Sequence, residues 1–339
     1  MIGYYIHHHG LGHLHRARCV ARHARTPVTG LSCLPRPADW TGEWIRLPSD
    51  AGQEAGAADP TAHGRLHWVP LHHTGLRARM GAIASWIERT APTLLVSDVS
   101  VEVATMARLM GVPVMVSAMR GDRSDPAHRL AYDIADALLA PWPATLPEPD
   151  WPPEWHAKAV CTGAFSRYDG RPRVERRPTR RQVLVLLGSG GTTVQEDDVR
   201  KAAEATPGWD WIALGGAGNW TEDPWPLLCQ ADVVVTHAGQ NAVAECAAAR
   251  TPALVVPQER PHDEQHATAR ALAAAGIATV RTRWPAPHEW PQLLTTVRQA
   301  GGRRWRQWAP GDGAAQAGRL LDELAATVSP RESPACALP

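Results

Sequence analysis

The stretch that follows the apolar run Ala231–Thr236 reads His237-Ala238-Gly239-Gln240-Asn241-Ala242-Val243-Ala244-Glu245. Gly239 lets the backbone approach a phosphate where a helix begins, and His237 and Asn241 can donate hydrogen bonds to phosphate oxygens. Glu245 lies one helical turn after Asn241 on the same face, where a carboxylate can accept both hydroxyls of a ribose. The stretch predicts a strand, a turn and a helix that bind a nucleotide. The alternative is that Glu245 is only a buried structural carboxylate.

Two neighbouring stretches extend this prediction. Glu264 and Gln265 open the next predicted helix, where polar side chains can bind sugar hydroxyls. A glycine-rich loop, Gly188-Ser189-Gly190-Gly191, follows the predicted strand Gln182–Leu187. Its backbone N–H groups can form a nest for a diphosphate. Because the loop lacks the lysine of a P-loop, a P-loop ATPase is disfavoured.

A second glycine motif, Gly10-Leu11-Gly12-His13, follows the predicted strand Met1–Ile6. His13 begins the next predicted helix, and a helix N-terminus lowers the basicity of an imidazole, which keeps the ring able to accept a proton. His13 is therefore a candidate general base for a hydroxyl nucleophile. A glycine-rich turn with incidental histidines is an equally weighted alternative, since a lone GxG is a weak signal.

Asp98 directly follows the predicted strand Thr93–Ser97. The carboxyl ends of parallel strands line the ligand crevice, so Asp98 could orient His13 through the other ring nitrogen. The alternative is that Asp98 or Ser100 caps the helix that starts at Val101.

Arg120 begins a charged loop after the predicted strand Val114–Ser117 and is a candidate contact for an acceptor, although a solvated loop is favoured. The three consecutive histidines His7–His9 are also candidate metal ligands. Successive residues of an extended segment point to opposite faces, so the three rings are not expected to converge. No metal site is predicted.

Strand-like runs alternate with Ala-rich helical stretches along the whole chain, which is typical of βαβ units in a parallel sheet. The pattern restarts after a Pro- and Trp-rich segment at 140–153 and a basic stretch at 171–181. We therefore predict two α/β domains, at 1–168 and 181–328, joined by a linker at 169–180. Residues 329–339 lack apolar periodicity and are predicted to form a mobile tail.

Length and charge agree with this division. The 339 residues are about twice the ~150 of one compact domain. A formal net charge of +1 argues against a general nucleic-acid binder. No apolar run approaches the ~18 residues of a membrane span, and Met1–Ile6 lacks the basic region of a signal peptide. We expect a cytoplasmic protein with at most peripheral membrane contact.

These motifs together resemble those of the GT-B superfamily of nucleotide-sugar-dependent glycosyltransferases. The segment 237–245, followed by Glu264-Gln265, looks like the donor signature of the UDP-glycosyltransferases and of the cell-wall N-acetylglucosaminyltransferase branch. Gly10-x-Gly12-His13 looks like the acceptor loop of that branch. The resemblance implies two Rossmann-like domains facing across a cleft, with the acceptor and base on the first and the nucleotide sugar on the second.

Carried over by position, the resemblance implies inverting transfer from a UDP-sugar, or next a dTDP-sugar, without a metal or other cofactor. His13, helped by Asp98, would deprotonate an acceptor hydroxyl on a small molecule or a lipid-linked compound. His237 and Asn241 would hold the diphosphate, and Glu245 the ribose. Glu264 and Gln265 would bind the transferred sugar. The acceptor and the oligomeric state stay open.

Three departures from the family pattern put the nucleobase and the sugar in doubt: Gln240 replaces a Trp, Ala242 replaces a small hydroxyl residue, and Thr268 replaces an Asn. Two other functions remain open. Residues 10–16 also fit GxGHxxR, as in the related nucleotide-sugar hydrolase of pseudaminic acid synthesis. A non-catalytic nucleotide-sugar sensor or assembly partner is the third.

Overall fold

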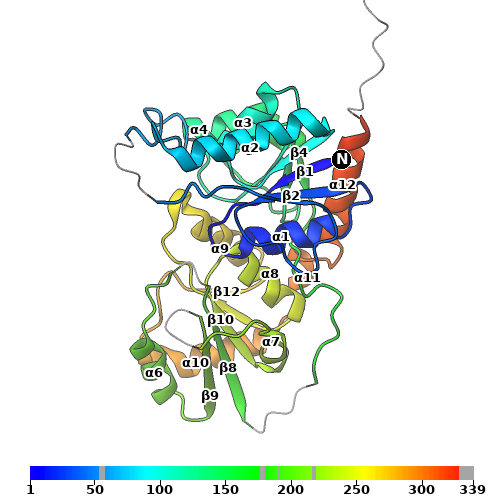
Figure 1. Cartoon of the computed structure of the whole chain (residues 1–339). Coiled ribbons are helices and arrows are strands. Elements are labelled where there is room, and N and C mark those ends of the chain that lie inside the picture. The colour runs from blue at the N-terminus through cyan, green and yellow to red at the C-terminus, as the bar shows by residue number, and fades with distance from the viewer. Residues whose placement is uncertain (53–57, 176–179, 189–190, 216–218, 328–339) are drawn as a thin grey trace, which may run out of the picture.

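The computed structural model describes residues 1–52, 58–175, 180–188, 191–215 and 219–327. Within them the chain forms two parallel β-sheets, each covered by helices on both faces, and the two halves lie one above the other (Figure 1). This arrangement is the predicted pair of α/β units.

The first sheet has seven strands in the order β3-β2-β1-β4-β5-β6-β7. Its strands are β1 (Ile2–Tyr5), β2 (Val28–Ser32), β3 (Trp44–Arg46), β4 (Leu94–Ser97), β5 (Val114–Ser117), β6 (Ala137–Ala140) and β7 (Ala159–Cys161). The helices between them are α1 (Gly12–Ala21), α2 (Thr74–Thr90), α3 (Val101–Leu109), α4 (Pro126–Ile134) and α5 (Pro153–Lys158).

The second sheet has five strands in the order β12-β11-β10-β8-β9. Its strands are β8 (Arg181–Leu186), β9 (Trp209–Leu214), β10 (Val233–Thr236), β11 (Ala253–Val255) and β12 (Thr279–Val280). The helices are α6 (Glu196–Glu204), α7 (Trp225–Gln230), α8 (Gln240–Ala249), α9 (Glu264–Ala274), α10 (Trp290–Ala300) and α11 (Trp305–Trp308), with 3₁₀ turns η1 (Pro261–Asp263) and η2 (Pro287–Glu289).

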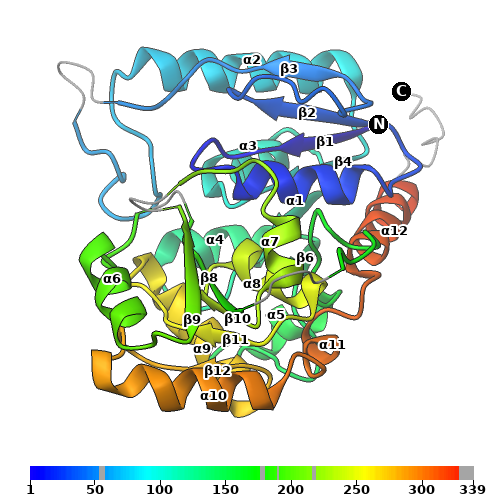
Figure 2. The same cartoon turned by 90° about the horizontal axis from the view of Figure 1, so that it is seen from below.

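The central strands of both sheets are largely apolar because both of their faces are buried, as in β1, β4 and β10. In β1, Ile2 and Tyr4 pack under α1, while Tyr5 points to the opposite face, under α2 and α3. The two views of the cartoon agree that α2 and α3 lie on one side of this sheet and α1 on the other (Figure 2). Burial of alternate side chains on opposite faces therefore fixes the register of the sheet.

The strand register brings the two N-terminal motifs to one edge. Tyr5 of β1 pairs with Ser97 of β4, so the chain leaves both strands at the same level. The backbone N–H of Asp98 donates to the carbonyl oxygen of Tyr5 at 3.2 Å. In the second sheet, Leu186 pairs with Thr236, and the loop after β8 therefore meets His237.

Helix α12 (Gly313–Thr327) crosses back to the first half. It packs against α1 and β4, and Leu321 is buried in the same core as Ile2 (Figure 1). The carboxylate of Asp322 accepts hydrogen bonds from the backbone N–H groups of Arg25 and Thr26, the latter at 2.8 Å. The predicted domain at 181–328 placed this helix with the second half, whereas its packing assigns it to the first.

The predicted tail at 329–339 and residues 176–179 of the predicted linker lie outside the described residues. None of the helices in the described part of the chain combines the length and apolar character needed to cross a membrane.

Candidate active site

His13 and Asp98 form a hydrogen-bonded pair at the edge of the first sheet. Helix α1 begins at Gly12, so His13 lies in its first turn, and its Nδ1 is 3.1 Å from Oδ1 of Asp98. Ser100 caps α3 by accepting from the backbone N–H of Val103 at 3.3 Å. Asp98 is therefore not the helix cap, and its fully buried carboxylate is directed at His13.

Arg16 is the third member of this group. Its Nε donates to Oδ2 of Asp98 at 3.2 Å, and its Nη2 forms an ion pair with Oδ1. Burial alone would raise the pKa of Asp98, but Arg16 and His13 together lower that pKa to about 2. The carboxylate therefore stays ionised. Nη2 of Arg16 also lies 3.0 Å from Nδ1 of His13, so the ring proton is shared between two competing neighbours. In the tautomer with its proton on Nδ1, His13 donates to Asp98 and keeps the Nε2 lone pair as the proton acceptor. The sequence contained Arg16 in its GxGHxxR pattern, although its contact with Asp98 was not predicted.

The start of α8 meets the start of α1 across the junction of the two halves. Nη1 of Arg16 donates to Oε1 of Gln240. A Cβ placed on Gly12 would lie 2.5 Å from Nδ2 of Asn241, so the absence of a side chain at Gly12 makes room for the amide of Asn241. Gly239, which has no side chain to cap the helix, is the N-cap residue of α8. The helix N-terminus that was predicted to hold a diphosphate thus faces the His13 pair.

His237 is enclosed by backbone. Its Nε2 lies 3.0 Å from the N–H of Gly188, and its Nδ1 lies 2.8 Å from the N–H of Gly239. Burial, with Arg260 as the second cause, lowers the pKa of His237 to about 4, so the ring is neutral at pH 7. A neutral ring has one acceptor nitrogen, so only one of these amides has its hydrogen bond satisfied by the ring. The predicted contact of His237 with phosphate stays a prediction.

The structure describes two of the four residues of the glycine-rich loop, Gly188 and Gly191. Ser189 and Gly190 lie outside the described residues. Gly191 has a positive φ of 86°, which favours glycine, and its carbonyl oxygen accepts from Arg260. The loop therefore contacts the segment that leads to η1.

Glu245 is buried on α8 and forms an ion pair with Arg167, whose Nε lies 3.0 Å from Oε1. Burial raises the pKa of Glu245, and Arg167 partly offsets this effect. The space beside this pair, lined also by His15 and Asn241, is about 10 Å³, room for at most about one water molecule. The predicted ribose contact therefore requires the ion pair between Arg167 and Glu245 to open.

Glu264 and Gln265 differ in their surroundings. Oε1 of Gln265 accepts from the backbone N–H of Gln258 at 2.9 Å, and Gln265 is almost fully buried. Gln258 in turn accepts from the backbone N–H of Thr193 at 2.9 Å. Gln265 thus positions the loops around the site. Burial raises the pKa of Glu264, which lies within electrostatic reach of Arg123 and His13.

The remaining residues of the acceptor prediction lie nearby. Gly10 has a positive φ of 71° in the turn before α1. Arg120 lines a cavity of about 750 Å³ between the loop at 120–124, the segment at 145–152 and α9. Its guanidinium, however, is held by the carboxylate of Glu148 and the carbonyl oxygen of Leu146. Acceptor contact by Arg120 stays a prediction.

Two histidine groups surround this region. The rings of His7 and His8 stack with their centroids 4.7 Å apart, which differs from the expected alternation because both residues follow the end of β1. A separate group of four side chains comes together at the junction of the two halves: His67, Asp125, His128 and His262. The sequence did not predict this group, since its members are spread over almost 200 positions.

Comparisons with known proteins agree with this geometry. Residues 220–299 match the glycosyltransferase family 28 C-terminal domain. The chain is 30% identical, over 51% of its length, to the UDP-N-acetylglucosamine–N-acetylmuramyl-(pentapeptide) pyrophosphoryl-undecaprenol N-acetylglucosamine transferase of Cupriavidus metallidurans, of which it covers 54%. The chain thus spans about half the length of the first curated relatives it matches.

Two solved structures show the same fold over nearly the whole chain. The glycotransferase of kitacinnamycin has a TM-score of 0.71 at 18% identity and covers 95% of this chain and 98% of its own. The spinosyn rhamnosyltransferase complexed with thymidine diphosphate has a TM-score of 0.59 at 16% identity, with 96% of each chain covered. The fold is GT-B. The predicted fold class and the predicted resemblance to GT-B nucleotide-sugar-dependent glycosyltransferases are confirmed.

Proposed function

We propose that this chain is a glycosyltransferase that moves a sugar from a nucleoside-diphosphate sugar to an acceptor hydroxyl, with inversion at the anomeric carbon. One observation carries the proposal: the His13–Asp98 pair on the first half faces the N-terminus of α8 on the second half. A proton acceptor on one wall and an anion-binding helix end on the other are the two groups that this transfer needs. The glycosyltransferase domain at 220–299 and relatives named as glycosyltransferases support an enzyme.

In the proposed mechanism, Nε2 of His13 takes the proton of the acceptor hydroxyl. The acceptor oxygen attacks the anomeric carbon as the bond from that carbon to the diphosphate oxygen breaks. The diphosphate leaves with the bonding electron pair, and the backbone N–H groups at the start of α8 stabilise its charge. Asp98, kept ionised by Arg16, stabilises the imidazolium that forms on His13.

The proposed donor is a UDP-sugar, with a dTDP-sugar as the second choice. A curated relative has a UDP-sugar in its name, and a solved structure of the same fold is a complex with thymidine diphosphate. Glu245 would accept the ribose hydroxyls after its ion pair with Arg167 opens. We propose that the diphosphate needs no metal, because a helix N-terminus and Asn241 would supply the positive charge and donors there.

We propose two classes of acceptor, a small natural product and a lipid-linked sugar. The relative from Cupriavidus metallidurans acts, by its name, on an undecaprenol-linked compound, and solved structures of the same fold include the glycotransferase of kitacinnamycin. Both classes present a hydroxyl to His13, so the chemistry at the base is the same.

A nucleotide-sugar hydrolase is the second candidate, because Arg16 of the GxGHxxR pattern does contact Asp98. In that case His13 would activate water in place of an acceptor hydroxyl. Free sugar released from a nucleotide sugar without acceptor would favour this reading.

Thermal unfolding with UDP, dTDP, GDP and ADP, each with EDTA and against its own nucleotide-free baseline, tests the proposal. A ligand at 100 times its dissociation constant stabilises by about 2.7 kcal/mol, which raises the midpoint by a few degrees. We expect a shift with UDP or dTDP. No shift with any of the four would contradict the donor site and would favour an assembly role without nucleotide. A shift followed by sugar release without acceptor would identify a hydrolase.

A further inference from the structure

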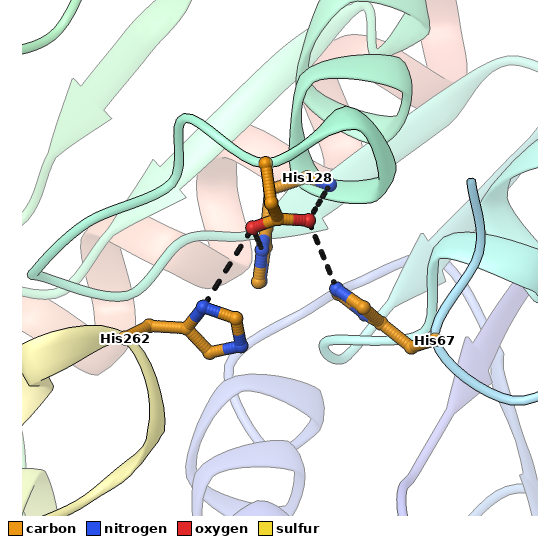
Figure 3. Close-up of side chains that lie close together, drawn as sticks. His67, His128 and His262 are labelled. Carbon is orange, nitrogen blue, oxygen red and sulfur yellow. Dashed lines mark hydrogen bonds and ion pairs between the residues drawn. The ribbon is translucent and has the colours of Figure 1, made fainter. Parts of the chain in front are cut away.

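Four side chains of metal-binding type surround one point where the two halves of the molecule meet. His67 lies in the loop before α2, Asp125 is the N-cap of α4 and His128 lies in its first turn; all three belong to the first half. His262 comes from η1 of the second half. Figure 3 shows the three rings arranged around one carboxylate. We call these four residues the junction cluster.

The spacing within the junction cluster fits a small cation. Nε2 of His67 lies 3.2 Å from Oδ1 of Asp125, and Nδ1 of His262 lies 3.6 Å from Oδ2. Nδ1 of His128 lies 2.5 Å from Oδ2. One ligand atom from each residue lies within 4.8 Å of all the others. Tetrahedral Zn²⁺ with bonds of 2.0–2.1 Å sets its ligand atoms about 3.3 Å apart, so shifts of about 1 Å complete the site.

We propose that the junction cluster binds one Zn²⁺ ion that fastens the two halves together. Imidazole nitrogens and a carboxylate oxygen are ligands that zinc accepts. Because the protein supplies all four positions, the ion would be structural, with no open position for a reacting water. The proposal does not depend on the glycosyltransferase reaction, since none of the four residues is placed in that mechanism.

The second half presents His262 in a fixed position. Its φ is 62°, and its carbonyl oxygen accepts from the backbone N–H of Asp122 at 2.8 Å. A Cβ on Gly121 would lie 2.2 Å from that oxygen, so glycine is needed for this close contact. Two backbone segments from different halves thus hold the ring of His262 against Asp125.

Without a metal, hydrogen bonds to the carboxylate of Asp125 hold the junction cluster together. Oδ1 of Asp125 accepts from the backbone N–H groups of Ala127 and His128, both at 3.1 Å, so the carboxylate also caps α4. Nη1 of Arg123 lies 3.3 Å from Nε2 of His128, which places the proton of that ring on Nδ1. Zinc at Nδ1 moves this proton to Nε2, and Arg123 must then turn away. Arg123 therefore opposes the metal, and its replacement should strengthen binding.

The test uses the full chain after removal of metals by a chelator. Co²⁺ is titrated as a visible probe of four-coordinate binding, and Zn²⁺ then displaces it. We expect one ion per chain, and a loss of affinity of at least 10-fold in His262→Asn and in His67→Ala. Asn tolerates the positive φ at position 262, so this variant keeps the backbone. Arg123→Gln should bind more tightly than the unchanged chain.

A matched control is His63→Asn, because His63 lies in the same loop as His67 and also has a positive φ, of 55°, but its side chain is 92% exposed. This variant should bind Zn²⁺ like the unchanged chain. Zn²⁺ should also raise the thermal midpoint of the unchanged chain by several degrees and that of His262→Asn by much less. Absence of one-to-one binding, or equal affinity in all variants, would show that the junction cluster is a hydrogen-bonded group only.

Discussion

Nδ1 of His13 lies 3.1 Å from Oδ1 of Asp98, although the two residues are 85 positions apart in the chain. His13 lies in α1, which follows β1, and Asp98 follows β4, the parallel neighbour of β1. The pair depends on Arg16, which contacts both oxygens of the buried carboxylate. One helical turn of α1 therefore supplies both the base and the cation that keeps its partner ionised. This arrangement determines how the site should respond to substitution.

His13→Ala should abolish turnover and leave nucleotide binding unchanged, because the ring acts on the acceptor and not on the donor. General base catalysis contributes about 10²–10⁴-fold, so kcat should fall by at least 100-fold. The measurement is a rate assay with calorimetric nucleotide binding. His23→Ala, at an exposed histidine just after α1, is the control and should keep full activity. Normal turnover in His13→Ala would remove the residue as the base.

Asp98→Asn should lower both activity and stability. The amide leaves Arg16 buried without its counter-charge, and breaking a buried ion pair costs about 3–5 kcal/mol. Urea unfolding and the rate assay measure the two effects. Asp39→Asn is the matched control, because Asp39 pairs with Arg18 on the same helix at an exposed position. That change should cost less than about 1 kcal/mol. Equal losses in both variants would contradict the special role of Asp98.

Glu245→Ala should weaken nucleotide binding by about 10-fold or more, since a hydrogen bond to a charged group contributes about 1.5–3 kcal/mol. Titration calorimetry with the preferred diphosphate measures this change. Arg167→Ala is the informative companion, because it removes the ion pair but keeps the carboxylate. We expect unchanged or tighter binding there. Equal weakening in both variants would assign the effect to the ion pair and not to ribose.

Gly12→Ala should displace the side chain of Asn241, because the added Cβ would lie 2.5 Å from its Nδ2. Since Asn241 is proposed to bind the diphosphate, we expect weaker nucleotide binding and reduced turnover. Gly81→Ala is the control: Gly81 lies inside α2 with no atom within 4 Å of an added Cβ. That substitution should stabilise the protein by about 0.5–1 kcal/mol. Unchanged nucleotide binding and turnover in Gly12→Ala would contradict a role for Asn241 in its observed position.

Stability should fall as the pH drops from about 6.5 to about 4. The pKa of His237 is lowered to about 4 by burial, so in this range the unfolded chain binds a proton that the folded chain does not. His237→Asn should lose this contribution and show a shallower pH dependence in urea unfolding. His288→Asn, at an exposed histidine, should keep the original slope. Identical slopes in the two variants would contradict the lowered pKa.

The strands nearest the site could be predicted from the sequence, because strands buried on both faces are continuous apolar runs. Val114–Ser117 was predicted with the bounds that the structure gives, and Thr93–Ser97 differs from β4 by one residue. The edge strand Trp44–Arg46 was not predicted, since it is only three residues long and partly exposed. Helix Thr74–Thr90 was also missed, because its charged residues interrupt a recognisable apolar face.

The site could be predicted where its residues are adjacent in sequence. In the segments 237–245 and 10–13, the spacing of the site residues along the chain is enough to predict that they lie together. The contact of Arg167 with Glu245, and the junction cluster, depend on how the two halves meet, and no local pattern contains that information. Asp98 could be predicted only in part. The sequence placed it at the end of a strand but left open whether it caps the next helix, and the structure shows that Ser100 is the cap.

The return of α12 to the first sheet means that the backbone passes between the halves twice, once before β8 and once before α12. Two covalent crossings restrict relative motion to rotation about the line that joins them, so the halves should open and close along one path. The two crossings also determine where a chimera with a related protein can be joined. A chimera that exchanges the second half must keep residues 313–327 with the first, because a single exchange point at 169–180 would leave α1 and β4 against a foreign helix.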